Sequence, residues 1–522
     1  MKSGVARLAL AALWACALAC AASALPARAV DRSLGADLPK PAPSGLPWTA
    51  DATTRLSRDL DAFLDVRAAP TLRGAHVGLL VLDTRSGNVL YAHNPDDAFV
   101  PASTFKLLTG SAALAILGPK HRFRAQALLD PQTASLIIRG GGDPLLRAAD
   151  LDAMAFAVRT AGATAFPVSV GVDSTAFEST PYLPGWCWDD FPFYYSAVVS
   201  AATIEENVVH LTVTPGAAGG APATVRAGPP PLDAQVEAPA GGCPFTRAVV
   251  VIPQARTAEP GTPDTVDVAR TTGGCITVTG SLPAGSAPDA IDAAVPSAVW
   301  YLRTLSVDAL ERTGVNVRPI GPVAGPPEAS DGEAVSPPGA RVVWTHDGEP
   351  LTDLLADMWW PSDNLVAELL LREIGRQTAG TPGTSLHGIA AERAWLTSIG
   401  VDPGTLTIVD GSGLSTYDRI TPRALAAILQ ADWNGPYRAA VLDDLPLAGV
   451  RGSTAGDFAG TLAAQRTFAK TGSMNHTRGL AGYLATLHHG AVTFAFSIDD
   501  WMGAQADLDA LRARVLTRLI GD

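Results

Sequence analysis

The sequence predicts an α/β domain that is interrupted by a large, mostly β insertion. Helical periodicity and hairpin patterns occupy both ends of the 522-residue chain. Residues 120 to 295 instead form short β-branched runs separated by Gly and Pro. The composition is 47% hydrophobic and only 17% charged, which favours a globular protein with a large core. We therefore assign residues 51–122 and 296–522 to one domain and residues 123–295 to the insertion.

The first part of the domain begins with apolar residues at helical spacing over 53–66. Residues 76–82 and 89–92 then flank a turn that contains Gly87, which predicts a β-hairpin. An apolar helix is expected after Ser103, because nearly every position up to Leu117 is apolar or small.

The insertion is expected to hold strands near residues 136–138, 168–172, 208–213 and 248–252. Gly140-Gly141-Gly142 precedes Pro144 and lacks a following Lys-Ser/Thr pair, so it predicts a tight turn rather than a phosphate loop.

The second part of the domain alternates helices and strands. Helical spacing recurs over residues 298–313, 353–374 with a break at Pro361, 390–399 and 421–432. Residues 467–471, 480–487 and 492–498 are typical of strands, and a final helix places Leu508, Leu511, Val515 and Leu519 on one face.

Residues 1–29 resemble an export signal. Lys2 and Arg7 precede an apolar run, and Ala27-Arg28-Ala29 is a small-x-small cleavage site. Lipidation at Cys20 is an alternative, and peripheral association with the membrane is therefore left open. Residues 30–50 are rich in Pro, Ala and Gly and are expected to form a linker. We predict an exported, periplasmic protein.

The chain is acidic, with a formal net charge of −13. Removal of residues 1–29 would take away three further positive charges, which argues against nucleic acid and anionic lipid as partners. The oligomeric state is not predicted.

Three cysteines follow the signal. Cys243 and Cys275 are the better pair for a disulfide in an exported protein, and Cys187, between two Trp residues, is expected to be buried and unpaired. The cysteine and histidine spacings predict no metal site, and no cofactor is expected.

Ser103 and Lys106 form a Ser-x-x-Lys motif in a chain that has only five lysines. Residues three apart share one face of a helix, so the hydroxyl and the amine would meet. A buried lysine can lose its proton near neutral pH, which arginine cannot, and could activate the serine as a nucleophile. The alternative is a helix N-terminal serine followed by a solvated lysine.

Ser362-Asp363-Asn364 follows Trp359-Trp360-Pro361. The proline ends a helix, so Ser362 and Asn364 can present their side chains on a turn, with the tryptophans as a wall. The hydroxyl could pass a proton to a leaving group, and the amide could contact both Lys106 and a substrate carbonyl. The alternative is an ordinary helix N-cap.

Lys470-Thr471-Gly472-Ser473 ends a predicted strand. Its amine and hydroxyls could hold a substrate carboxylate, Gly472 would permit close approach of the backbone, and nearby N–H groups could stabilise an oxyanion. The alternative is a solvated strand end.

The order Ser-x-x-Lys, Ser-Asp-Asn, Lys-Thr-Gly is the signature of penicillin-binding proteins and class A β-lactamases. The chain most closely resembles the class C low-molecular-mass penicillin-binding proteins, the D-alanyl-D-alanine carboxypeptidase/endopeptidase family. Further segments that resemble this family are residues 140–144, 184–186, 410–415, 445–450 and 480–483. The resemblance extends over nearly the whole chain after the signal, including the insertion.

The resemblance implies an antiparallel sheet flanked by helices, and a serine peptidase that acts on peptidoglycan stem peptides and cross-links and binds β-lactams. It implies Ser103 as nucleophile, Lys106 as base, and Ser362, Asn364 and Lys470 as further catalytic residues. Lys470, Thr471 and Ser473 would hold the terminal carboxylate of the substrate, and Gly472 would belong to the same substrate-binding strand.

The resemblance also implies a subsite for the side chain of the diamino acid in the stem peptide. Asp173 would face its amino end, with Phe177 and Asn475 as neighbours. Relatives often have Arg where this chain has Thr416, although Arg419 could substitute. This difference affects the expected side-chain specificity and leaves the acylation chemistry unchanged.

Three alternatives differ in testable features. A class A β-lactamase would need a Glu-x-x-Leu-Asn segment after Ser362, which the sequence lacks. An esterase of the same fold would usually lack Lys-Thr-Gly. A binding or scaffold protein with an inactive site would not need an intact set of Ser103, Lys106 and Lys470.

Overall fold

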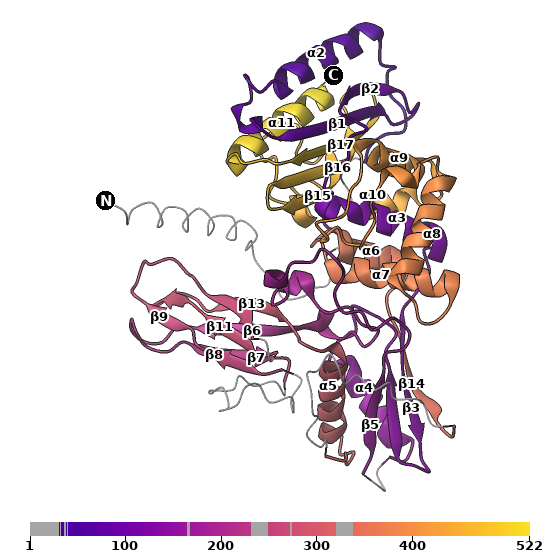
Figure 1. The fold of residues 1–522 in the computed structure, drawn as a ribbon, viewed down its shortest axis with the longest axis vertical. Coiled ribbons are helices and arrows are strands. Elements are labelled where there is room, and N and C mark those ends of the chain that lie inside the picture. Colours follow the sequence, from indigo (N-terminus) through magenta and orange to yellow (C-terminus); the bar gives the residue numbers. More distant parts are fainter. Residues whose placement is uncertain are drawn as a thin grey trace.

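The computed structural model describes residues 31, 33–35, 38, 40–163, 167–230, 249–271, 274–319 and 338–521. An α/β part that contains both ends of the described chain lies at one end of the molecule, and the insertion occupies the other end (Figure 1). The predicted signal, residues 1–29, lies outside the described residues, as does Cys243.

The α/β part is built on a five-stranded antiparallel sheet in the order β15-β16-β17-β1-β2. His76 pairs with Asp499, so a strand from the start of the chain completes a sheet made largely by its end. The strands are β1 (His76–Asp83), β2 (Val89–His93), β15 (Thr467–Met474), β16 (Thr477–Ala485) and β17 (Ala491–Asp499). This confirms the hairpins and the antiparallel sheet that we expected.

Two terminal helices, α2 (Ala50–Leu64) and α11 (Gln505–Gly521), cover one face of the sheet (Figure 1). Leu56 and Leu60 of α2 are fully buried, and the Thr49 hydroxyl caps that helix by accepting the N–H of Ala52. The apolar face predicted for α11 is buried against the same core.

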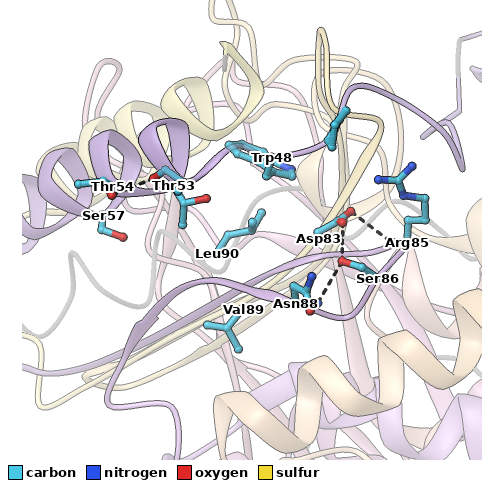
Figure 2. A pocket seen from close by; sticks show the side chains of 12 residues that line it. Trp48, Thr53, Thr54, Ser57, Asp83, Arg85, Ser86, Asn88, Val89 and Leu90 are labelled. Carbon is cyan, nitrogen blue, oxygen red and sulfur yellow. Dashed lines mark hydrogen bonds between the residues drawn. The ribbon is translucent and has the colours of Figure 1, made fainter.

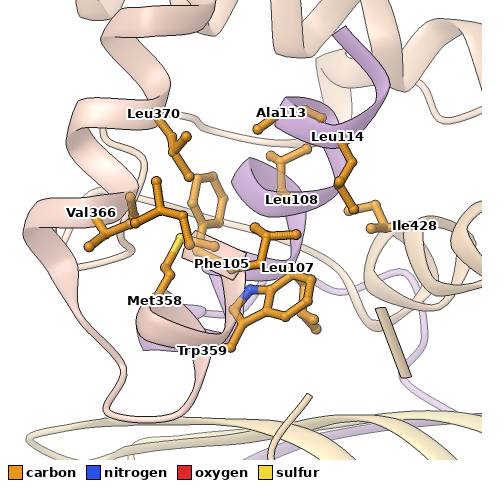
Figure 3. Close-up of a cluster of buried hydrophobic side chains, with 14 of the residues drawn as sticks. Phe105, Leu107, Leu108, Ala113, Leu114, Met358, Trp359, Val366, Leu370 and Ile428 are labelled. Carbon is orange, nitrogen blue, oxygen red and sulfur yellow. The ribbon is translucent and has the colours of Figure 1, made fainter. Parts of the chain in front are cut away.

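The other face carries the remaining helices of the α/β part, which are α3 (Lys106–Leu117), α6 (Leu351–Trp359), α7 (Asn364–Ala379), α8 (Ser385–Ser398), α9 (Pro422–Asn434) and α10 (Arg438–Asp444). Helix α3 is buried from Lys106 to Leu114, and Figure 3 shows its apolar side chains packed against α6, α7 and α9. The nucleophile motif therefore begins a helix in the middle of the core.

The helix break expected at Pro361 is present, since α6 ends at Trp359 and α7 begins at Asn364. The expectation that Trp359 and Trp360 form a wall of the site is wrong. Both rings are buried, and they donate their indole N–H groups to the carbonyls of Lys106 and Asp444. They pack behind the motifs because a bulky apolar ring gains more from the core than from a solvated cleft.

The insertion contains a four-stranded sheet in the order β14-β3-β4-β5. Its strands are β3 (Arg124–Asp130), β4 (Ser135–Arg139), β5 (Ser169–Asp173) and β14 (Arg341–Asp347), with helices α4 (Asp150–Thr160) and α5 (Ala298–Arg312) packed together beside them. A second lobe holds β6 (Val208–Thr214), β7 (Thr224–Gly228), β8 (Val251–Pro253), β9 (Arg256–Ala258), β10 (Asp267–Arg270), β11 (Ile276–Thr279), β12 (Ser281–Pro283) and β13 (Asp289–Ala294).

The end of the insertion lies later than the expected residue 295. Helix α5 belongs to the insertion core, and β14 pairs with β3 so that Asp347 faces Arg124. The expectation that α5 belongs to the α/β domain is wrong. Periodicity identifies a helix, but it does not show which core the helix covers. The chain returns to the α/β part near Gly348.

The triple glycine, for which we expected a tight turn, lies just before a turn that begins at Pro144, and its glycines are in close contact with neighbouring backbone. A Cβ added at Gly140 would lie 2.2 Å from the carbonyl oxygen of Ala201, and one at Gly141 would lie 1.8 Å from that of Arg124. Gly142 has a φ of +77° and touches the ring of Phe177.

The described part of the expected linker is held against the α/β part. The N–H of Leu46 donates to the carbonyl of His488 at 2.8 Å, and the rings of Trp48 and His489 stack 4.0 Å apart. A cavity of about 650 Å³ lies between this segment, α2 and the β1–β2 turn (Figure 2). The cavity lies at the β2 edge of the sheet, which is the edge opposite β15, and no residue of the three motifs lines it.

Cys275 is disulfide-bonded, and the expected partner Cys243 lies outside the described residues. Cys187 is free, as predicted, but the expectation that it is buried is wrong: it is exposed, and the neighbouring Trp188 is 63% exposed. No helix within the described ranges has the length and apolar character needed to cross a membrane.

Candidate active site

Ser103 lies in a short 3-10 helix, η2 (Ala102–Phe105), that leads directly into α3. Ala102, the residue before it, has a φ of +45°, which is unusual for a residue other than glycine. Strain of this kind, of the order of 1–3 kcal/mol, is characteristic of functional sites, where the surrounding structure must hold it. It fixes the direction in which Ser103 leaves the turn.

Lys106 is fully buried, and its Nζ lies 2.8 Å from the Oγ of Ser103. Its other two contacts are the Oδ1 of Asn364 at 2.5 Å and the carbonyl oxygen of Ser412 at 2.9 Å. The Ser103–Lys106 meeting that the three-residue spacing predicted is therefore present. Three acceptors fix the position of the amine.

Burial lowers the pKa of Lys106 from its ordinary value to about 8. The carboxyl groups of Asp410, Asp363 and Glu368 oppose this shift because they favour the charged amine. An amine with this pKa can exchange its proton near neutral pH, as a general base requires.

Asn364 is the first residue of α7, and its amide joins the two parts of the molecule. Its Oδ1 accepts from Lys106, while its Nδ2 donates to the carbonyl of Tyr195 at 2.6 Å. Tyr195 lies in η4 (Tyr194–Ser196), which is part of the insertion. The insertion therefore helps to orient this amide, so that its oxygen faces Lys106.

Ser362 lies in the turn between α6 and α7 with a φ of +67°, a second strained position beside the site. Its Oγ accepts a hydrogen bond from the Nζ of Lys470 at 2.8 Å. Lys470 on β15 is fully buried and also donates to the carbonyl of Thr471. Burial, reinforced by repulsion from Lys106, lowers the pKa of Lys470 well below its usual value.

Gly472 allows β15 to touch the turn that carries Ser103. A Cβ at this position would lie 2.6 Å from the carbonyl oxygen of Pro101 and 3.0 Å from the N of Thr104. Beside it, the hydroxyl of Thr471 is hydrogen-bonded to that of Ser453 at 2.8 Å, and Ser473 is exposed. The three motifs, from α3, the α6–α7 turn and β15, therefore converge at one place.

The three residues expected at a side-chain subsite make contacts outside the three motifs. Asp173 ends β5 and pairs with the Nε of Arg139 at 2.9 Å, Phe177 is buried against Gly142, and Asn475 is exposed in the β15–β16 turn. Within the described residues, no hydrogen bond joins any of them to the three motifs. Arg419, the suggested substitute at Thr416, donates to the Thr416 carbonyl instead.

Residues 410–418 contribute to the site in ways that the sequence analysis did not assign. The carbonyl of Ser412 receives a hydrogen bond from Lys106, and the carboxyl groups of Asp410, within this segment, and of Glu368, on α7, accept backbone N–H groups of the same segment. A backbone carbonyl leaves no mark in a residue pattern. Glu368 follows Asn364 by four positions, which places both on one helix face and is the only available signal.

The arrangement supplies a hydroxyl beside an amine of lowered pKa and a second hydroxyl–amine pair next to it. Within the described chain, no group of three or more His, Cys, Asp or Glu side chains could hold a metal ion. A hydroxyl–amine contact of this kind is what a nucleophilic hydroxyl with an adjacent general base requires.

Comparisons with known proteins identify relatives over most of the chain. The chain is 33% identical over 461 residues to a D-alanyl-D-alanine carboxypeptidase of Actinomadura sp. (strain R39), which covers 84% of this chain and 80% of the relative. It is 22% identical over 453 residues to the D-alanyl-D-alanine carboxypeptidase DacB of Haemophilus influenzae, which covers 84% of this chain and 88% of that one.

The fold is similar to that of penicillin-binding protein 4 from Haemophilus influenzae, with a TM-score of 0.71 at 20% identity over 88% of this chain and 100% of the crystal structure. The model of the D-Ala-D-Ala carboxypeptidase 3 (S13) family matches residues 56–517. With a match of that length and a relative this similar over most of its sequence, the chain belongs to the D-Ala-D-Ala carboxypeptidase 3 (S13) family.

Proposed function

We propose that this protein is a serine D-alanyl-D-alanine carboxypeptidase that acts on peptidoglycan stem peptides through an acyl intermediate on Ser103, and that it binds penicillins at the same serine. The observation that carries the proposal is the 2.8 Å contact between the Oγ of Ser103 and the buried Nζ of Lys106. Family membership and the relatives named as carboxypeptidases support the substrate class.

In the first step, the neutral amine of Lys106 accepts the proton of Ser103, and Oγ bonds to the carbonyl carbon between the two D-alanines. The backbone N–H groups of Ser103 and Ser473 hold the resulting oxyanion. Gly472 supports this role, because only a residue without a Cβ lets β15 come this close to the Ser103 turn.

In the second step, the C–N bond breaks and the terminal D-alanine leaves. Ser362 relays to the departing nitrogen the proton that Lys106 removed, so Lys106 is neutral again. Asn364 holds the peptide. Water then attacks the ester: Lys106 takes a proton from water, the hydroxide bonds to the acyl carbon, and Oγ leaves with that proton to regenerate Ser103.

The terminal carboxylate of the substrate binds to Lys470, Thr471 and Ser473. The low pKa of Lys470 supports this role, because a carboxylate beside it stabilises the charged amine and offsets its burial. β-Lactams carry an equivalent carboxylate and a strained amide, so they acylate Ser103 and leave slowly.

Three finer assignments belong to the same proposal. Asp173, with Phe177 and Asn475 as neighbours, recognises the amino end of the diamino-acid side chain; in the free protein Arg139 neutralises the Asp173 carboxylate. The enzyme also cuts cross-links as an endopeptidase. Residues 1–29 direct its export to the periplasm and are removed from the mature protein.

The test is intact-mass measurement of the protein after incubation with a labelled penicillin, beside Ser103→Ala. We expect one adduct per chain in the wild type and none in the variant. Release of D-alanine from a pentapeptide then measures carboxypeptidase activity, and cleavage of cross-linked muropeptides measures endopeptidase activity. A folded wild-type protein without an adduct would refute the acyl-serine mechanism.

A further inference from the structure

A loop of residues 410–415, which we call the Asp410 loop, contacts Lys106 through the carbonyl of Ser412. The carboxylate of Asp410 accepts the N–H groups of Ser412 at 3.1 Å, Gly413 at 2.6 Å and Ser415 at 2.6 Å. Ser412 and Gly413 donate to its Oδ1, whereas Ser415 donates to its Oδ2, which also accepts the indole N–H of Trp186 at 2.9 Å. The loop is therefore wound around one buried carboxylate.

A second carboxylate holds the same loop from the side of α7. The Oε1 of Glu368 accepts the N–H of Gly411 at 3.0 Å and that of Ser412 at 2.9 Å, and the side chain is fully buried. The carbonyl of the same residue, Ser412, accepts the hydrogen bond from Lys106. One residue therefore lies between the Glu368 carboxyl and the amine of the proposed base.

The Asp410 loop is also in close contact with the turn that carries Ser103, at Gly413. A Cβ at Gly413 would lie 2.0 Å from the carbonyl oxygen of Ala102 and 2.8 Å from the Cβ of Phe105. There is no space for a side chain between the loop and this strained turn. A displacement of the loop would therefore change the distance between Ser103 and Lys106.

We propose that Glu368 is a positioning residue for Lys106, which acts by holding the Asp410 loop so that the Ser412 carbonyl fixes the amine against Ser103. This inference rests on the proposed function, since it assigns Lys106 the role of base. Glu368 contacts neither Ser103 nor Lys106 through the hydrogen bonds described, so its effect passes through the loop.

Charged groups surround Glu368 from several elements. Arg372, on its own helix, lies 3.5 Å from Oε2 and is also 3.6 Å from Glu178. The remaining groups that interact with Glu368 are Asp410 and Asp418 from the loop region, Glu392 on α8 and Lys106 on α3; Asp363, at the start of α7, acts on Lys106 as well.

The signs of these interactions predict a pH effect. Burial, followed by repulsion from Asp410, raises the pKa of Glu368 to about 8, so it ionises in the same range as Lys106. The Asp418 carboxyl, whose pKa rises to about 11 through burial and the nearby Asp410, stays protonated there. The negative charge on Glu368 favours protonated Lys106, so its removal should lower the pKa of the amine.

The experiment compares Glu368→Gln with Glu368→Leu by the second-order rate constant of acylation by a fluorescent penicillin, measured across pH. Gln keeps an oxygen acceptor for the two N–H groups, whereas Leu has a similar volume and keeps none. We expect Glu368→Gln to stay within about threefold of the wild type, and Glu368→Leu to fall by about 30- to 100-fold, as a misplaced reacting group does.

The pH profile gives a readout that a purely structural role would not move. We expect the acid limb of Glu368→Gln to shift to lower pH by about half a unit or more, because an opposing charge has been removed. Glu392→Gln is the matched control: Glu392 is a fully buried glutamate with a similarly raised pKa, and it makes no hydrogen bond to the Asp410 loop within the described contacts. Its rate should match the wild type, and its acid limb should move less than that of Glu368→Gln, because Glu392 interacts with Glu368 and Asp410 and is not among the groups that act on Lys106.

The inference is overturned if folded Glu368→Leu acylates as fast as the wild type, or if Glu368→Gln leaves the acid limb in place. If Glu368→Leu does not fold, the acid limb of Glu368→Gln decides. Failure of the proposed function is a separate result, because it would appear as a missing penicillin adduct on the wild type itself.

Discussion

Lys106 and Lys470 lie in adjacent regions of the site at the same depth, and their surroundings differ in charge. Three carboxyl groups, from Asp410, Asp363 and Glu368, oppose the effect of burial on Lys106. Around Lys470 the neighbouring charge is that of Lys106, and it adds to the effect of burial. This difference supports the proposed division of roles, in which Lys106 exchanges a proton near neutral pH and Lys470 receives an anion.

The difference separates two roles that residue type alone leaves combined. Both amines donate to a serine hydroxyl at 2.8 Å, so contact distance does not distinguish them. What differs is the compensation for burial: carboxyl groups within the protein supply it to Lys106, and a substrate carboxylate would supply it to Lys470.

The largest expected effect comes from replacing each lysine by arginine, which keeps the charge and removes the ability to lose a proton. Lys106→Arg should reduce acylation by a labelled penicillin by about 1,000-fold or more, the range of a lost general base. Lys470→Arg should cost far less, about tenfold, because it retains the positive charge that holds a carboxylate. Equal losses in the two variants would contradict the division of roles.

A second test disturbs the contact that keeps the two regions in register. Gly472→Ala would place a Cβ 2.6 Å from the Pro101 carbonyl and push β15 away from the Ser103 turn. We expect acylation to fall about 100-fold, as for a reacting group misplaced by about 1 Å. Thermal unfolding should show a loss of about 1–3 kcal/mol.

Gly456→Ala is the control for that variant, since nothing lies within 4 Å of a Cβ at position 456. It should leave both the acylation rate constant and the melting temperature unchanged. A fully active Gly472→Ala protein would show that close approach of β15 is not required.

A third test is the pH dependence of the wild type. In the proposed mechanism the neutral form of Lys106 is the reactive one, and burial lowers the pKa of this amine to about 8. Acylation should therefore rise with pH through that value, with a gain of about tenfold from about pH 7 to about pH 9. An acylation rate constant that is flat across this range would exclude Lys106 as the titrating base.

The smallest expected effect concerns Ser453, whose hydroxyl is bonded to that of Thr471 beside the proposed carboxylate site. Ser453→Ala should raise KM for a pentapeptide about threefold with kcat unchanged, because it loosens one binding hydroxyl and touches no reacting atom. A change in kcat at constant KM would instead place Ser453 in the chemical step.

Much of the site could be predicted because its chemistry depends on particular side-chain types at short spacing in the sequence. Ser103 and Lys106 are three residues apart on a helical segment, and Lys is rare enough in this chain to stand out. The contacts that complete the site come from backbone carbonyls of Ser412 and Tyr195, which any residue could supply. No pattern of residue types could identify them.

The fold shows a similar division. The sheet strands and helices follow from alternation and helical spacing, but helix α5 was placed in the wrong part of the molecule. Its buried residues, including Tyr301 and Leu302, pack on the insertion core. An apolar stripe shows that a helix covers something, and only the tertiary structure shows what it covers.

The pairing of β3 with β14 brings the chain back to the point where it left the α/β part. The N–H of Gly348 donates to the carbonyl of Phe123, and that of Leu351 to the carbonyl of His121, so the two crossings lie side by side. More than 200 residues separate these partners along the chain. In space, α3 and α6 are consecutive elements, and the α/β part reads as an ordinary continuous fold into which a separate module has been spliced.

An insertion that was merely attached would leave the geometry of the site unchanged. Here, however, the carbonyl of Tyr195 in the insertion accepts a hydrogen bond from Asn364. The geometry of the second motif therefore depends in part on the fold of the insertion. Assembly of the nucleophile's surroundings thus depends on a domain that contributes no residue to the three motifs, and a defect in that domain becomes a defect in chemistry.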